Sequence, residues 1–293
     1  MRKRNLCLTV IFISCLVMFS AVAAGAARTQ PKALTGSATD FKRAKFDNPT
    51  RIDNKWLPLK PGRQFTYQGS AIPEGSKTRV ARRVVSTVTD VSKWVGGVRT
   101  LVIWERDYTA GKLGESEIAF FAEDNAGNVW LVGEYPEEYE NGKFVGAPTW
   151  ISGKKGARAG IAMLANPQKG APSYSQGYAP PPVDFKDRAR VYKTGQKTCV
   201  PVKCYKDVLV IEEFEQGVAG VFHLKYYAPG VGLVRVGWRG AKEVEKETLK
   251  LVKHQQLRGA ALANARKQAL KLDRNAYKRS AAVYGSTPKA KPL

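Results

Sequence analysis

Three carboxylates in the first half of the chain have a spacing that could support chemistry. Glu105 and Asp107 are two positions apart, and Glu117 lies in the next strand-like segment. Because every second residue of a strand points to the same face, their side chains could meet across neighbouring antiparallel strands. Two carboxyl groups held at a suitable separation can hydrolyse a glycosidic bond. The favoured alternative is a solvated strand face, on which these acids neutralise nearby arginines.

Other signatures of catalysis are missing from the sequence. Two histidines and four cysteines are too few for a multi-histidine metal site. No P-loop, dinucleotide-binding glycine motif or complete nucleophile elbow occurs. We therefore predict no metal and no cofactor. Glu105, Asp107 and Glu117 remain the catalytic candidates for the alternative of an enzyme that acts on envelope polysaccharide.

Two cysteines, Cys199 and Cys204, are expected to form a disulfide. Pro201 lies between them and favours a turn that would bring the two Cα atoms within bridging distance. An oxidising compartment would favour their pairing. A metal site is the alternative, but no further cysteine or histidine lies nearby to complete one.

The N-terminus has the pattern of a secretory signal peptide over residues 1–26. A basic start at Arg2, Lys3 and Arg4 precedes an apolar stretch that ends in small residues. We expect cleavage there, with an uncleaved membrane anchor as the alternative, and no later segment is apolar enough to span a bilayer. The mature protein is therefore predicted to be secreted or periplasmic. Residues 27–45 are polar and basic and are expected to form a flexible leader.

The remainder is expected to form one β-rich domain over residues 46–284. Segments rich in β-branched and aromatic residues alternate with Gly, Pro and Asn turns, which predicts an antiparallel meander that curves into a half-barrel or open barrel. Strands are expected at 65–69, 80–91, 101–108, 117–122, 128–134, 190–193, 208–214, 221–227, 231–238 and 244–252. The Pro- and Gly-rich residues 136–190 are expected to cover or rim this sheet.

A C-terminal helix is predicted over about 258–284. Five small or apolar residues are spaced as on one side of a helix: Leu262, Ala265, Ala269, Leu272 and Ala276. Basic residues surround the remaining sides. We expect this helix to pack across the open face of the half-barrel, with binding to an anionic membrane as the alternative. Residues 285–293 are expected to form a flexible basic tail.

The charge of the chain limits its partners. Lys and Arg number 48 against 25 Asp and Glu, a formal net charge of +23. In an exported protein, positive charge favours contact with anionic lipids, glycolipids or wall polymers, whereas nucleic acid is not a plausible partner. Simple solubility is the alternative explanation.

Four segments carry a resemblance to known proteins. They are FDNPTRIDN at 46–54, GNVWLVGE at 127–134, GIAMLANP at 160–167 and KYYAPGVGLV at 225–234. With these segments the chain resembles an uncharacterised family of exported bacterial proteins with open, half-barrel β folds. It is more distantly similar to the lipoprotein-carrier and lipid-binding half-barrels of the bacterial envelope, on architecture alone. The resemblance implies a shared fold and brings no catalytic residues.

These patterns favour a non-enzymatic exported protein with a ligand cavity. Four aromatic side chains, Trp104, Phe120, Trp130 and Tyr226, are expected to be buried between sheet and helix and to line that cavity. Basic groups at its mouth would attract an apolar or anionic amphiphilic ligand, such as a lipid. The alternatives are the polysaccharide-acting enzyme and a cationic structural protein that binds surfaces.

Overall fold

The structure is a computed structural model that describes residues 40–73 and 75–293. The predicted signal peptide and most of the predicted leader therefore lie outside the described residues. The strands are β1 (Arg63–Ala71), β2 (Val80–Val95), β3 (Val98–Thr109), β4 (Lys112–Glu123), β5 (Val129–Glu140), β6 (Lys143–Gly146), β7 (Trp150–Ile151), β8 (Arg158–Met163), β9 (Tyr174–Ser175), β10 (Gly177–Tyr178), β11 (Asp187–Val200), β12 (Lys203–Glu215), β13 (Phe222–Ala228), β14 (Gly232–Arg239), β15 (Thr248–Gln256) and β16 (Lys291–Pro292). Two helices follow β15, α1 (Gly259–Arg279) and α2 (Ala281–Tyr284).

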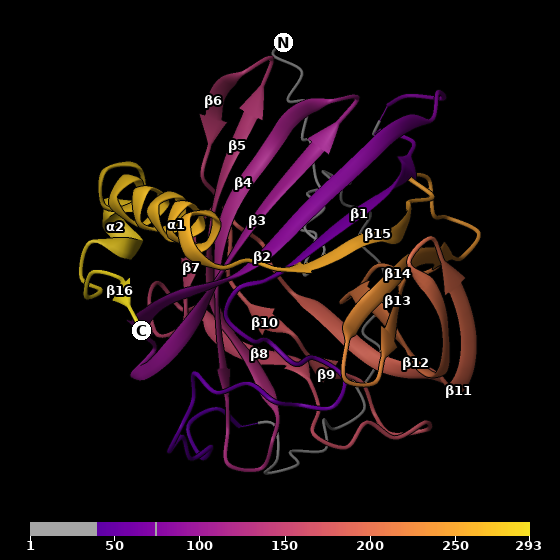
Figure 1. The fold of residues 1–293 in the computed structure, drawn as a ribbon, viewed down its shortest axis with the longest axis horizontal. Helices are drawn as coiled ribbons and strands as arrows, with labels where there is room; N and C mark the ends of the chain where they lie inside the picture. Colours follow the sequence, from indigo (N-terminus) through magenta and orange to yellow (C-terminus); the bar gives the residue numbers. More distant parts are fainter. Residues whose placement is uncertain (1–39, 74) are drawn as a thin grey trace, which may run out of the picture.

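The strands form one antiparallel sheet that curls into a nearly closed barrel (Figure 1). Its order is β10-β8-β5-β4-β3-β2-β1-β15-β14-β13-β12-β11-β9. Most neighbours are consecutive in the chain, as expected for hairpin-linked strands. The predicted β-rich fold with a curved antiparallel sheet and one long C-terminal helix is confirmed.

The two ends of the sheet meet in the Pro- and Gly-rich excursion. β9 pairs with β11, β10 pairs with β8, and a single residue, Gln176, separates β9 from β10. Close contact at this junction requires Gly160, because a Cβ there would lie 2.1 Å from the backbone nitrogen of Gly177. β11 is paired with β9 only at Arg188 and Ala189. The barrel is therefore closed along part of its height, and the rest of β11 is an edge.

Successive side chains of each strand point alternately into the barrel and away from it. On β3, Glu105 and Asp107 point into the barrel, whereas Trp104 and Arg106 point outward. Both faces of β3, β4 and the first half of β5 are buried. The inner face meets the opposite wall of the barrel, and the outer face is covered by other elements.

The helix α1 packs against the outer face of β2 to β5, at the side of the barrel (Figure 1). Its buried stripe consists of Ala265, Ala269, Leu272 and Ala276, together with the charged Asp273. The predicted helix and its packing on the sheet are confirmed, but the expectation that it covers the open face is wrong. β8 to β11 join the two ends of the sheet along part of its height, and the helix packs instead on the apolar outer faces of β2 to β5.

The segment after the helices is also attached to the sheet. β16 pairs with β2, and the backbone N–H of Leu293 donates to Asp90. Residues 285–293, expected as a flexible tail, thus add a short strand to the barrel. The last residues of the expected leader pack as well, since the ring of Phe41 lies 5.2 Å from that of Trp130.

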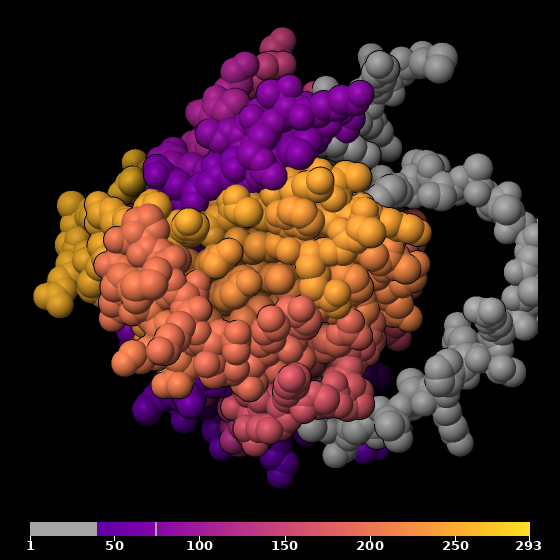
Figure 2. Space-filling view, turned by 90° about the vertical axis from the view of Figure 1, so that its right-hand side faces the viewer, coloured from indigo at the N-terminus to yellow at the C-terminus, as the bar shows by residue number. Residues whose placement is uncertain are grey.

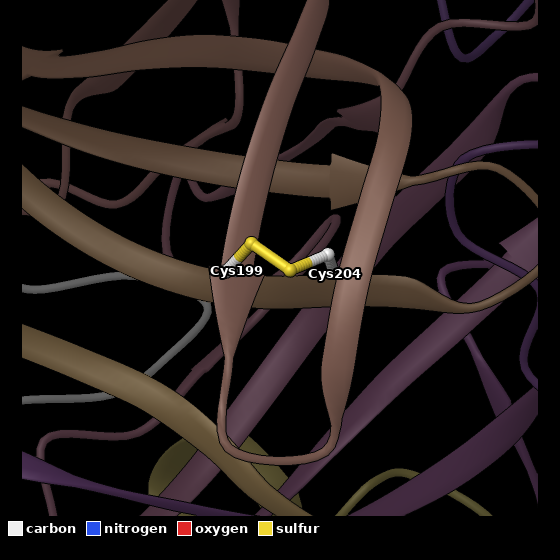
Figure 3. Close-up of a disulfide and its surroundings, with 2 residues drawn as sticks. All are labelled: Cys199 and Cys204. Atoms are coloured by element: carbon white, nitrogen blue, oxygen red, sulfur yellow. A yellow bond between two sulfur atoms is a disulfide. The ribbon is translucent and has the colours of Figure 1, made fainter.

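The predicted disulfide between Cys199 and Cys204 is present (Figure 3). The two cysteines lie opposite each other at the turn end of the β11–β12 hairpin. By closing a very short loop, the bridge fixes the register of these two strands at their turn. Such bridges persist in oxidising compartments, consistent with a location outside the cytoplasm.

Candidate functional site

The barrel interior contains an unusual concentration of acidic side chains. Nine buried carboxyl groups come from β3, β4, β5, β11, β12 and the loop before β15: Glu105, Asp107, Glu115, Glu117, Glu134, Asp187, Glu213, Glu243 and Glu247. Buried acids are rare in proteins unless they are paired. We call these nine residues the acidic cluster.

The predicted meeting of Glu105, Asp107 and Glu117 does occur. Glu105 lies directly opposite Glu117 on the β3–β4 ladder, and Asp107 lies opposite Glu115. Only 4% of Glu105, 4% of Asp107 and 1% of Glu117 is exposed to solvent. The favoured expectation of a solvated face is therefore wrong, because the polar face of these strands is the one that turns into the barrel.

The inward-facing side chains of β3 and β4 change from apolar to acidic along each strand. On β3, the inward residues pass from Leu101 and Ile103 to Glu105 and Asp107. On β4, the same change runs from Ala119 to Glu117 and Glu115. One half of the interior is thus apolar, and the other half, toward the β3–β4 turn, is acidic.

The basic side chains inside the barrel are fewer than the acids. Arg82 forms an ion pair with Asp107, and its Nε lies 3.8 Å from a carboxyl oxygen of Glu247. Lys225 lies 3.7 Å from Glu213, which also accepts a 3.0 Å hydrogen bond from Gln176. Within the described residues these two are the buried bases of the interior. The acidic cluster is therefore only partly neutralised.

The buried carboxyl groups resist ionisation. Burial raises the pKa of Glu117 well above its usual range, and neighbouring carboxylates, first Glu134 and then Glu115, raise it further. Burial likewise raises the pKa of Glu134 to about 8, although a 2.7 Å hydrogen bond from the Trp150 indole lowers it. Asp187 is shifted upward by burial and by Glu213. At neutral pH Glu134 is thus mostly protonated, and burial disfavours the ionised form of the others as well.

A small cavity reaches this cluster at the end of the barrel formed by the β12–β13 and β14–β15 loops. It holds about 60 Å³ of free space. Its lining consists of five acids, four apolar residues, two lysines and a histidine: Asp187, Glu213, Glu215, Glu243, Glu245, Phe214, Val218, Val221, Val244, Lys225, Lys242 and His223. Figure 2 shows the side of the molecule on which the orange segment, which includes β12 to β15, covers most of the surface.

Two groups in this cavity, His223 and Glu243, decide what it offers to a ligand. Burial, reinforced by Lys225, lowers the pKa of His223 to about 4, so this histidine is neutral at physiological pH. Glu243 accepts hydrogen bonds from two backbone N–H groups through one oxygen. Its other oxygen is buried and has no hydrogen-bond partner within the described part of the chain, with the neutral His223 Nε2 at 3.5 Å. That oxygen is available to a donor from a ligand.

The four predicted ligand-binding aromatics do not lie together. Trp104 points outward and donates its indole N–H to Ser116 at 3.1 Å, and Phe120 lies on the outer face, 6.2 Å from the ring of Tyr284. Trp130 donates to Asp124 at 2.7 Å. Tyr226 is half-buried beneath the Arg235 guanidinium. They are packing residues of several regions and do not line one shared cavity.

Other aromatic side chains, which sequence reasoning missed, line the interior. Tyr67 donates its hydroxyl to the backbone oxygen of Leu233 at 3.0 Å. Tyr227 and Tyr174 are buried close to Glu213, and each has its pKa raised by burial and by that carboxylate. The strands that carry these tyrosines, β1, β9 and β13, contain no acid of the cluster, so no local pattern in the sequence linked them to it.

The geometry limits the chemistry of this site. No three His, Cys, Asp or Glu side chains in residues 40–73 and 75–293 are arranged to hold a metal ion. The Glu105–Glu117 pair lies inside the barrel, where a polysaccharide cannot reach it. Among the described helices, none has the length and apolar character to cross a bilayer.

Comparisons with known proteins give fold likeness only. No protein-family model and no curated protein matches the chain. A proposed exported protein with a YmcC-like fold from Bacteroides fragilis is 12% identical, with a TM-score of 0.36, over 69% of this chain and 100% of its own. A proposed lipoprotein from Parabacteroides distasonis is 13% identical, with a TM-score of 0.30 and the same coverage. Likenesses this remote carry no argument about activity.

Proposed function

We propose that this protein is an exported, non-enzymatic binding protein whose barrel receives the positively charged head of a small organic amine. The observation that carries the proposal is the cavity at the acidic end of the barrel, where a buried oxygen of Glu243 receives no hydrogen bond from any described residue. An ammonium group would supply donors to the carboxylates and would offset their mutual repulsion.

The composition of the cavity fits such a ligand. Phe214, Val218 and Val221 provide apolar surface next to the acids, which suits the alkyl part of an amine. A free volume of about 60 Å³ has room for a group of a few heavy atoms, with the rest of the ligand at the mouth.

The charge and size of the cavity argue against the amphiphile expected from the sequence. A lipid chain needs a cavity of roughly 300 Å³ or more, whereas this one holds about 60 Å³. An anionic headgroup would also be repelled by the acidic cluster. The basic side chains that suggested an anionic ligand lie mainly on the outside of the barrel.

The polysaccharide-acting enzyme is not favoured by the structure. Its catalytic pair would be Glu105 and Glu117, both buried inside the barrel. Water and sugar must reach such a pair from opposite sides of the glycosidic bond. The cavity that reaches the acidic cluster is lined by other residues and is too small for a sugar ring with its neighbours.

Binding of n-butylamine and 1,4-diaminobutane to the purified protein, followed by NMR titration and calorimetry, tests the proposal. We expect both amines to bind, and neither the neutral 1-butanol nor the anionic butyrate to bind comparably. Binding should tighten from pH 5 to pH 8, because the cavity carboxyls must lose their protons to pair with an ammonium group.

A matched pair of variants places the site. Glu243→Gln should weaken amine binding by about tenfold or more, the loss of one charge-assisted hydrogen bond. Glu140→Gln, at the β5–β6 hairpin, removes the same charge outside the cavity and should leave binding unchanged. Absence of amine binding, an equal loss in both variants, or a lipid found by native mass spectrometry of the purified protein would each refute the proposal.

A further inference from the structure

The buried and exposed charges of this protein have opposite signs. Arg82, Lys93 and Lys225 are the buried bases among the described residues, whereas most of the buried charged groups are acids. The other basic side chains of the described residues therefore lie at least partly on the outside of the molecule. An exposed surface of one sign attracts partners of the other.

The helix α1 carries the most regular part of this positive surface. Lys267, Lys271, Arg274 and Lys278 follow each other at intervals of four, three and four residues, so they form one row along the helix. All four are exposed, and none forms an ion pair within the described chain. We call these four residues the basic row.

The acids near α1 are engaged elsewhere and do not neutralise the basic row. Asp273 is buried and binds Lys93, and Asp90 pairs with Arg266. Glu137 is buried and pairs with Arg279. The row therefore presents its full charge to solvent.

Neighbouring features extend this surface. Lys289 and Lys291 are exposed on the C-terminal segment, which lies beside the helices (Figure 1). Leu293, which is 48% exposed, is hydrogen-bonded to Asp90, the partner of Arg266. Basic residues thus stand beside one exposed apolar side chain at the edge of the helix.

We infer that α1 binds the surface of an anionic phospholipid membrane through the basic row. The row spans about 16 Å along the helix, at 1.5 Å per residue, and α1 lies on the outside of the barrel (Figure 1). A row of cations on such a projecting helix fits a flat anionic surface, and four or more basic residues on an amphipathic helix are typical of binding to anionic lipids. The buried stripe of α1 is already occupied by the sheet, so the contact is electrostatic and the helix does not insert.

Co-sedimentation with phospholipid vesicles tests this inference. The purified protein should bind vesicles of 30% phosphatidylglycerol in phosphatidylcholine at 50 mM NaCl. It should not bind pure phosphatidylcholine vesicles, and at 500 mM NaCl binding to the anionic vesicles should fall by more than tenfold.

Two variants that remove the same number of charges separate the basic row from general positive charge. Replacing Lys267, Lys271, Arg274 and Lys278 by Gln should reduce vesicle binding by more than tenfold. Replacing Lys193, Lys197, Lys203 and Lys206 of the β11–β12 hairpin by Gln should reduce it by less than threefold. Circular dichroism confirms that both variants are folded.

Other outcomes overturn the inference. An equal loss in the two variants would assign binding to overall charge. Binding to soluble polyphosphate without binding to vesicles would assign the row to an anionic polymer. Neither outcome depends on amine binding inside the barrel, so this inference and the proposed function stand or fall separately.

Discussion

Two buried polar regions of this protein are built in opposite ways. Beneath α1, Glu137 accepts hydrogen bonds from three side chains, those of Tyr135, Tyr139 and Asn275. It also forms an ion pair with Arg279. Inside the barrel, Glu117 has no hydrogen-bond partner in the described chain apart from the Glu115 carboxyl, which can donate only when protonated.

The difference distinguishes a buried charge that stabilises the fold from buried acids that destabilise it. A buried carboxylate with several donors stabilises its surroundings, whereas a group of buried carboxylates without enough donors destabilises the folded state when it ionises. Residues that cost stability without a structural benefit are expected at functional sites. The contrast therefore supports a binding role for the interior and a structural role for the helix interface.

The largest expected effect comes from breaking the helix interface. Lys93 is fully buried, lies 2.9 Å from Asp273 and 3.0 Å from the Tyr277 hydroxyl, and donates to the backbone oxygen of Pro288. Lys93→Met should lower the free energy of unfolding by roughly 3–5 kcal/mol, because Asp273 is left buried without its counter-charge. Urea unfolding measures this loss.

A second substitution and a control make this result specific. Adding Asp273→Asn to Lys93→Met should restore part of the lost stability, because the uncompensated charge is gone. Arg266→Gln, on the same helix but in a half-exposed pair with Asp90, should change the urea midpoint far less. A loss in Lys93→Met no greater than that in Arg266→Gln would show that the interface does not depend on the buried pair.

The interior predicts an unusual dependence of stability on pH. A carboxyl whose pKa is raised in the folded state favours folding while it is protonated, and this contribution is lost as pH rises through the folded pKa. Burial raises the pKa of Glu134 from its usual 4.5 to about 8. The free energy of unfolding should therefore fall between pH 5 and pH 8, by about 1.4 kcal/mol or more, the equivalent of one pKa unit.

Urea unfolding at several pH values measures this slope, and the Glu134→Gln variant provides the control. The variant lacks the titrating group, so its stability should fall less over the same pH range. A stability that rises steadily from pH 5 to pH 8 would mean that the interior carboxyls are ionised and compensated in the folded protein.

The smallest expected effect compares one substitution in the two regions. At pH 8, Glu117→Gln should raise the free energy of unfolding by about 1 kcal/mol, because an amide is neutral without the cost of burying a charge or of holding a proton above the usual carboxyl pKa. Glu137→Gln should instead lower it by about 1–3 kcal/mol, because four donors lose a charged acceptor. Thermal and urea unfolding of both variants give the two signs, and equal signs would contradict the proposed contrast.

The sequence was sufficient for ten strands, β1 to β5 and β11 to β15, for the disulfide and for the C-terminal helix, because hairpin turns, cysteine spacing and helical periodicity are local signals. It missed the short strands β6 to β10 and β16. Alternation also showed that Glu105, Asp107 and Glu117 share a face. It could not show which face turns inward, since that depends on how the sheet closes. The closure is made by Gln176 and its neighbours, whose pairing partners β8 and β11 are not identifiable from local patterns.

The candidate site was harder to predict for the same reason. Glu134, Asp187 and Glu213 lie on three strands from both halves of the chain and approach each other only in the closed barrel. The four predicted aromatics lie in different regions, because hydrophobicity alone does not distinguish the inner wall of the barrel from the wall beneath the helix. Phe120 is fully buried, as expected, but by Tyr284 on the outside.

The partial closure of the sheet also bears on how the protein avoids association with other copies. Beyond Arg188 and Ala189, the outer edge of β11 has no second neighbouring strand in the described sheet. This edge is interrupted by register shifts and by Gly195, and it carries the exposed Lys193 and Lys197. Irregular spacing and lysines make a strand a poor template for a foreign strand. The sequence of the unpaired part of β11 therefore disfavours pairing with a strand of another copy.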